Sequence, residues 1–291
     1  MLSILIPTKN YDCHLLVEEL HKQGEKLGLP YEVILGEDGT SKNELHTNSC
    51  IDSLPHCRRI ILDKSIGRAA IRNRLADEAL YGNLIFIDSD AIAEKSDFLE
   101  LYATSLKEYE VVCGGLYHAN KMPDTSCSLR YKYEKKADKK RNAEVRNKAP
   151  FDKFSTFNFA IRKELFQSIR FNEGITRYGH EDTLFGKELE KLGAKLIHID
   201  NKLLHNGLES NDIYLNKVEQ SISTLIDIKE IIGTTPLLKA AEKLNRMHLT
   251  WLFATLWKWF HKAMRKNLTS SNPSLMVLAL YKLAYYCHLD R

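Results

Sequence analysis

The sequence has no long apolar run, no closely paired cysteines and little net charge. No stretch approaches the roughly 18 apolar residues of a membrane-spanning helix, and the best candidate, residues 275–281, stops at Lys282. The six cysteines include no Cys-x-x-Cys pair, which predicts reduced thiols and a cytoplasmic protein. The first eight residues lack the basic start and the apolar length of an export signal.

The composition excludes disordered, collagen-like and disulfide-rich chains, since 44% of the 291 residues are hydrophobic and 27% are charged. The net charge of +4 is too small to indicate nucleic-acid binding by itself. Residues 130–148 hold nine basic and three acidic residues, which leaves the rest of the chain at −2. Such a run is typical of a solvated face or a mobile loop, and we expect a flap here.

Short apolar runs alternate with helical patterns in the first half of the chain. The runs predict strands near residues 2–8, 31–35, 59–62, 83–87 and 110–113. This alternation predicts an α/β fold with a mostly parallel, Rossmann-like sheet and helices on both faces. Thr8, Asp38, Asp88 and Asp90 stand where predicted strands end. Because ligands of open α/β sheets bind outside the carboxyl ends of the strands, we expect these side chains to share one crevice.

The second half has a different pattern. Residues 154–162 and 195–199 predict further strands, with a helix between about 181 and 192. From about residue 211 onward only helical patterns remain. The sequence therefore predicts an α/β domain over residues 1–210 and an all-helical extension over residues 211–291.

Asp88-Ser89-Asp90 follows the apolar run 84–87. Two carboxylates spaced in this way at a strand end can share a hard divalent cation with a diphosphate, and Mg²⁺ and Mn²⁺ prefer few carboxylates together with phosphate oxygens and water. The alternative is a turn with two solvated acids.

Two other segments have the chemistry of a nucleotide site. Asp38 could accept a hydrogen bond from a base or a ribose, with Gly39 allowing close backbone approach, although a simple Asp-Gly turn has the same sequence. Gly67 opens a helix rich in small residues, and Arg68 or Arg72 could reach a base or a phosphate. Alternatively, this helix packs on the sheet with exposed arginines.

Glu181 and Asp182 begin another predicted helix. Acids in a first turn are favoured by the helix dipole, but one of them could be a general base aimed into the crevice. The residues alone do not choose between the two. His205 is a candidate third metal ligand, or else a structural histidine.

The order of these motifs resembles family-2 glycosyltransferases of the GT-A fold, over roughly residues 1–210. Two positions depart from the family pattern: Glu37 replaces the first of two aspartates, and Ile71 replaces the alanine of an Ala-Arg-Asn motif. The matching segments are Pro7-Thr8, Glu37-Asp38-Gly39-Thr40, residues 67–73, Asp88-Ser89-Asp90, Asn158, Glu181-Asp182 and His205.

The resemblance implies a role for each candidate residue. It implies Asp182 as the catalytic base, with Glu181 beside it orienting a substrate. It implies nucleotide contacts from Thr8, Asp38 and Arg72, with Gly67 allowing close approach. The implied contacts to the diphosphate and to Mn²⁺ or Mg²⁺ come from Asp88, Asp90 and His205.

The implied reaction is a metal-dependent, inverting transfer from a nucleotide-sugar, with a UDP-sugar expected, to a hydroxyl of a glycan or lipid-linked acceptor. A nucleotidyltransferase acting on sugar phosphates is one alternative, but that class has a Gly-rich loop where this chain has residues 9–12 without glycine. A non-catalytic nucleotide- or nucleic-acid-binding module would leave both acidic pairs unexplained. We therefore expect no nucleic-acid partner.

Residues 251–266 combine three tryptophans with basic residues and contain no acid. A basic, Trp-rich amphipathic helix can lie in a membrane interface, which would place the protein peripherally on the inner face of the membrane. Packing against the catalytic domain or a partner is the alternative.

Overall fold

The computed structural model describes residues 1–233 and 235–290, which form two compact units. The first unit contains residues 1–117, 140–174 and 181–207. The second contains residues 118–139, 175–180 and those from 208 onward. Two short segments of the first two-thirds of the chain therefore belong with the C-terminal helices.

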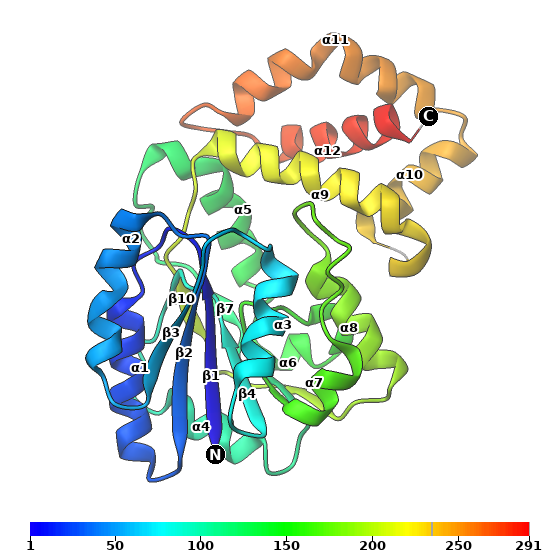
Figure 1. Cartoon of the computed structure of the whole chain (residues 1–291). Helices are drawn as coiled ribbons and strands as arrows, with labels where there is room; N and C mark the ends of the chain where they lie inside the picture. Colours follow the sequence, from blue (N-terminus) through cyan, green and yellow to red (C-terminus); the bar gives the residue numbers. More distant parts are fainter. Residues whose placement is uncertain (234, 291) are drawn as a thin grey trace. The chain divides into compact units, whose positions relative to one another are not determined.

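A seven-stranded sheet forms the centre of the first unit, with the order β3-β2-β1-β4-β8-β6-β9 (Figure 1). Only β8 runs antiparallel to its neighbours, β4 and β6, which confirms the prediction of a mostly parallel sheet. The strands are β1 (Leu2–Thr8), β2 (Tyr31–Asp38), β3 (Cys57–Leu62), β4 (Asn83–Ile87), β6 (Val111–Cys113), β8 (Asn158–Arg162) and β9 (Leu196–His198).

Helices cover both faces of this sheet, because successive side chains of a strand point to opposite faces. In β1, Ile4 and Ile6 belong to one apolar core and Leu5 to the other. The first core includes residues of α1 and α4, and the second includes residues of α3, α7 and α8. The helices of this unit are α1 (His14–Leu27), α2 (Lys42–Thr47), α3 (Arg68–Glu78), α4 (Phe98–Ser105), α6 (Ala143–Arg146), α7 (Lys163–Ile169) and α8 (Glu181–Lys191), with the short 3₁₀ helices η1 (Asn48–Ser53) and η3 (Phe151–Lys153).

A second, three-stranded sheet has the order β5-β10-β7. Its strands are β5 (Ala91–Ile92), β7 (Leu116–Tyr117) and β10 (Leu203–His205). The antiparallel register of β5 and β10 places His205 opposite Ala91, one residue after the Asp88-Ser89-Asp90 segment.

The regular elements described in the second unit are all helical, which confirms the predicted C-terminal helices. Helix α12 packs against α5, α9, α10 and α11, and Figure 1 shows α9, α11 and α12 side by side. Side chains of Ser210, Thr235 and Ser274 cap three of these helices. The helices are α5 (Ser128–Asp138), α9 (Asn211–Ile232), α10 (Pro236–Arg246), α11 (Thr250–Leu268) and α12 (Leu275–Leu289), with η2 (Thr125–Cys127) before α5.

The basic segment 130–148 is mostly helical rather than an irregular loop, and the expected flap stays a prediction. Its first part continues α5, and its last part contains α6. Arg146 is buried, and its guanidinium donates hydrogen bonds to the carbonyl oxygens of Cys113, Gly114 and Ile199. Part of the positive charge thus binds the ends of β6 and β9 in the first unit rather than facing solvent.

Candidate active site

The carboxyl ends of β1, β2 and β4 and the start of α3 line a pocket of about 440 Å³. This is the edge of the sheet at which the sequence predicted a crevice. Lys9, Ser65 and Arg68 also line the pocket, beside the predicted donor-site residues. Six predicted residues meet there: Thr8, Asp38, Gly67, Arg72, Asp88 and Asp90.

Asp38 holds the loop that leads into α3. Its Oδ2 accepts hydrogen bonds from the Ser65 hydroxyl at 2.8 Å and from the Gly67 N–H at 3.1 Å, while Oδ1 accepts from the Ile66 N–H at 2.6 Å. Gly39 has φ +67°, and a Cβ there would overlap the backbone of Ser65, which explains the glycine. Asp38 therefore shapes the pocket wall as well as lining it.

Arg72 and Asp88, which both line the pocket, form an ion pair with 2.5 Å between Nη2 and Oδ1. The Arg72 side chain is buried, and its guanidinium carbon lies 5.7 Å from the centre of the Phe171 ring. Burial raises the pKa of Asp88, and the charge of Asp90 adds to this effect, whereas Arg72 and Arg68 act in the opposite direction. An arginine fixed in this way can present positive charge to a phosphate.

Asp90 and His205 form the second polar pair, with 3.1 Å between Oδ2 and Nε2. The register of β5 and β10 brings them together, and the Asn206 N–H donates to the Asp90 carbonyl at 2.9 Å. A Cβ at Gly207 would overlap the Asp90 carboxylate. The glycine thus provides the space in which this carboxylate sits.

Asp90 and His205 provide donors that fit a divalent cation at a diphosphate. Over residues 1–233 and 235–290, no three His, Cys, Asp or Glu side chains are close enough together to form a complete metal site. One carboxylate and one imidazole are nevertheless sufficient protein ligands where phosphate oxygens and water supply the rest. Asp88 is hydrogen-bonded to Arg72 instead. Of the three predicted metal ligands, it is therefore the least suited to contact the cation directly.

Glu181 and Asp182 lie in the first turn of α8. Glu181 lies 3.8 Å from Arg68, a lining residue, so the start of α8 adjoins the pocket. Burial, followed by the charge of Glu181, raises the pKa of Asp182 to about 6, against opposing effects of Thr183 and Arg72. A carboxylate with this pKa is a better proton acceptor near neutral pH than an ordinary aspartate.

Asn158 and Glu37 belong to the motifs predicted from the sequence, but their hydrogen bonds are to other residues of the fold. Asn158 is buried and does not line the pocket. Its amide donates to the carbonyl oxygens of Gly115 and Asn201 at 2.9 and 2.8 Å, and it accepts from the Tyr102 hydroxyl at 2.5 Å. Glu37 is likewise buried and accepts a hydrogen bond from Asn48 at 2.9 Å. Both residues stabilise the strand ends without lining the pocket.

Sequence reasoning missed Lys9, Ser65 and Ser89 as lining residues. All three adjoin predicted motifs, which is the only signal that could have indicated them. Ser65 lies just before α3, which begins at Arg68 after Gly67, a residue with φ +96°.

The sequence profile of glycosyl transferase family 2 matches residues 3–170. That range is more than half of the chain and contains every strand that contributes to the pocket. The chain therefore belongs to glycosyl transferase family 2 and is a glycosyltransferase. The two alternative interpretations, a nucleotidyltransferase and a non-catalytic binding module, are therefore rejected. No curated protein matches the chain significantly in sequence.

Solved structures confirm a GT-A-like fold. The mannosyltransferase PcManGT from Pyrobaculum calidifontis, in complex with GDP-Man and Mn²⁺, matches with a TM-score of 0.58 and 13% identity over 98% of this chain and 84% of its own. Residues 1–349 of S. aureus TarS, in complex with UDP, match with a TM-score of 0.54 and 16% identity over 99% and 90%. TarS in complex with UDP-GlcNAc matches with a TM-score of 0.51 and 15% identity over the same shares.

Proposed function

We propose that this glycosyltransferase moves a sugar from a UDP-sugar to an acceptor hydroxyl with inversion at the anomeric carbon. The observation that carries the proposal is the pocket at the sheet edge, in which Asp88 and Asp90 stand together with the buried Arg72. This combination suits a diphosphate, because arginine offsets its charge and carboxylates can share a cation with it. The solved structures with UDP, UDP-GlcNAc and GDP-Man support a nucleotide-sugar donor.

In this proposal the nucleotide half of the donor lies against Thr8, Asp38 and Gly67, and the diphosphate lies near Arg72 and Asp88. Asp90 and His205, with Asp88 nearby, would hold Mn²⁺ or Mg²⁺. A bound cation would stabilise charge on the leaving diphosphate. The Mn²⁺ complex of PcManGT supports this part of the proposal.

Asp182 is the proposed base. As the acceptor oxygen forms a bond to the anomeric carbon, the bond from that carbon to the diphosphate breaks and its electron pair leaves with the diphosphate. The acceptor proton passes to the Asp182 carboxylate. The raised pKa of this group supports the role, and Glu181, held near Arg68, orients a substrate.

We further propose a glycan or lipid-linked acceptor and a cytoplasmic location, peripheral on the inner face of the membrane. Residues 1–210 would form the transferase domain and residues 211–291 an extension. Residues 251–266 lie in α11, on which Trp251, Trp259 and Phe260 are exposed. In the described ranges 1–233 and 235–290, no helix is long and apolar enough to span a membrane.

Thermal unfolding with a panel of nucleotide-sugars and Mn²⁺ tests the donor. We expect UDP-sugars to raise the melting temperature, because a ligand that binds only the folded state stabilises it. GDP- and dTDP-sugars serve as comparisons. Stabilisation by GDP-sugars alone would reject the UDP preference, and stabilisation by none would reject the donor site.

A further inference from the structure

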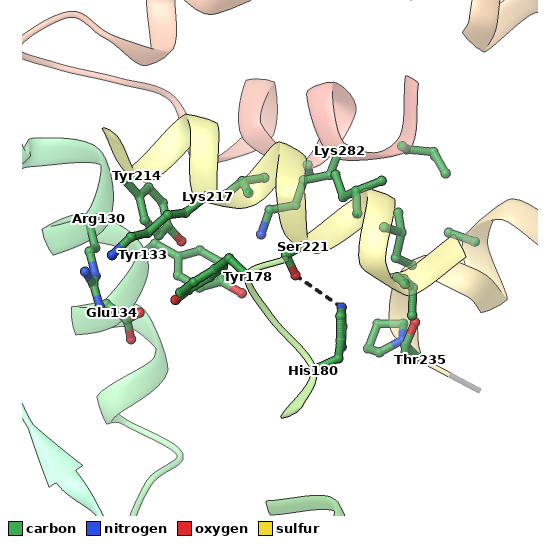
Figure 2. Close-up of a pocket in the computed structure, with 18 residues that line it drawn as sticks. Arg130, Tyr133, Glu134, Tyr178, His180, Tyr214, Lys217, Ser221, Thr235 and Lys282 are labelled. Carbon is green, nitrogen blue, oxygen red and sulfur yellow. Dashed lines mark hydrogen bonds between the residues drawn. The ribbon is translucent and has the colours of Figure 1, made fainter. Parts of the chain in front are cut away.

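The second unit contains a cavity of about 600 Å³. Helices α5, α9, α10 and α12 and the segment 175–180 line it, and Figure 2 shows the side chains around it. Its volume falls within the range of roughly 300–1,000 Å³ that small-molecule sites occupy. It shares no lining residue with the pocket at the sheet edge.

One end of the cavity is aromatic and basic. Figure 2 shows the tyrosines and basic side chains of this end on one side of the cavity and Thr235 on the other, with the hydrogen-bonded pair Ser221 and His180 between them. Each of three cations lies over a tyrosine ring: Lys282 over Tyr133 at 4.4 Å, Lys217 over Tyr178 at 5.2 Å and Arg130 over Tyr214 at 5.7 Å from the ring centre.

The charges at this end do not balance. Glu209 forms ion pairs with both Arg130 and Lys217, and Glu134 is the one acid among the described lining residues. Lys282 makes no ion pair with a carboxylate within residues 1–233 and 235–290. Three cations and one acid therefore line the cavity, with Glu209 outside the lining, and the Lys282 side chain extends toward the cavity (Figure 2).

The rest of the wall is apolar. It consists of aliphatic side chains from α9, α10 and α12, including Ile222, Leu225, Leu237 and Leu283. Burying hydrocarbon against such a wall is favourable, whereas a fully polar ligand would lose hydration there without compensation. One end of the cavity thus suits an anion and the other suits a hydrocarbon chain.

We infer that this cavity binds an amphiphile with one anionic group and a hydrocarbon chain. The anionic group pairs with Lys282 near Lys217, and the chain lies along Leu237 and Leu283. The inference concerns a site separate from the donor pocket, and it holds whether or not the donor is a UDP-sugar.

Calorimetry with the full chain and a series of alkyl phosphates, below their micelle concentrations, tests the site. Each methylene that enters the cavity should raise the affinity by up to about fourfold. Inorganic phosphate should bind much more weakly than decyl phosphate, and decanol should bind more weakly than decyl phosphate. Equal affinity for all chain lengths, or no binding, would overturn the inference.

Three variants separate the two ends of the cavity. Lys282→Gln should lower the affinity by a similar factor for every chain length, of the order of tenfold, because it removes the unpaired charge. Leu237→Ser should flatten the chain-length dependence instead, because it makes the wall polar. Lys258→Gln, an exposed residue of α11 that does not line the cavity, is the matched control and should bind like wild type.

A steric variant covers the case in which Leu237→Ser unfolds. Ala279 is an exposed lining residue of α12, so Ala279→Trp should leave folding intact and obstruct the cavity, with loss of decyl phosphate binding. Unchanged binding in both Ala279→Trp and Lys282→Gln would place the ligand elsewhere and reject the site. Tighter binding of decyl phosphate than of a short-chain phosphatidic acid would indicate a single-chain ligand. The reverse order would indicate a membrane phospholipid.

Discussion

The Oδ2 atom of Asp90 lies 3.1 Å from Nε2 of His205, although the two residues are far apart in the sequence. The short antiparallel pairing of β5 and β10 produces this distance, because it places His205 opposite the residue that follows Asp90. Gly207 then leaves the space that the carboxylate needs. One carboxylate and one imidazole are thereby held together, and the carboxylate residue, Asp90, lines the pocket at the sheet edge.

Asp90→Asn should weaken Mn²⁺-dependent UDP binding at least tenfold, since even indirect disturbance of a metal site costs roughly 10–100-fold in metal affinity. Calorimetric titration of UDP with and without Mn²⁺ measures the effect. Asp97→Asn, an exposed acid before α4, is the control and should bind like wild type. Unchanged UDP affinity in Asp90→Asn would remove this residue from the site.

Asp182→Asn should slow transfer by roughly 10²–10⁴-fold, the usual contribution of general-base catalysis. Donor affinity should change little, because the proposed donor contacts come from other residues. Glu181→Gln should slow transfer less if Glu181 only orients a substrate. If neither variant slows transfer by at least tenfold, Glu181 and Asp182 are not catalytic. If Glu181→Gln slows transfer more than Asp182→Asn, Glu181 is the base.

Transfer by the wild type should fall as the pH drops through about 6. Asp182 has its pKa raised to about 6, so below that pH the carboxylate is protonated and cannot accept a proton. The logarithm of kcat/KM should decline by about one per pH unit on the acid side. A profile flat down to pH 5 would contradict the assignment.

The same raised pKa predicts a stability effect. Above pH 6 the folded protein holds an ionised Asp182 that burial disfavours, whereas below the ordinary value of 3.8 the group is protonated in both states and no penalty exists. Asp182→Asn should therefore raise the free energy of unfolding at pH 8 by up to about 3 kcal/mol, since one pKa unit corresponds to about 1.4 kcal/mol. Urea denaturation at pH 8 and pH 4 checks this, and most of the gain should be lost at pH 4.

Replacing Trp259 and Phe260 together by serine should release the protein from anionic vesicles. These side chains are 73% and 54% exposed on α11, and basic residues on the same helix favour anionic lipid. Vesicle co-sedimentation at moderate salt measures the effect. Leu80→Ser, which removes a side chain that is 74% exposed in the first unit, should sediment like wild type. If the double variant also does so, α11 has another role.

The sequence was sufficient to predict the sheet and the position of the pocket. Continuous apolar runs such as Leu2–Thr8 and Asn83–Ile87 form central strands, and the polar residues after them converge because parallel strands end at one edge. Local pattern predicts these features because each depends on residues within a single strand and the turn that follows it.

Features that depend on distant pairing were beyond the reach of local pattern. The proximity of Asp90 and His205 requires the register of two very short strands. The basic segment was expected as a flap because its charge is visible in the sequence, whereas the carbonyl groups that hold Arg146 are supplied by the ends of other elements. Similarly, Asp38 was predicted as a ligand contact, while its hydrogen bonds to the loop before α3 appear only in three dimensions.

We propose that the pocket at the sheet edge binds a nucleotide-sugar and that its acids act on this ligand. Slow hydrolysis of nucleotide-sugars by the full chain, followed as release of UDP with and without Mn²⁺, tests this most directly. Wild type should release UDP from at least one UDP-sugar, and faster with Mn²⁺. Asp90→Asn should lose the Mn²⁺ stimulation, while Asp97→Asn should keep it. Equal release by wild type and Asp90→Asn, or no release from any UDP-sugar, would show that this pocket is not the proposed donor site.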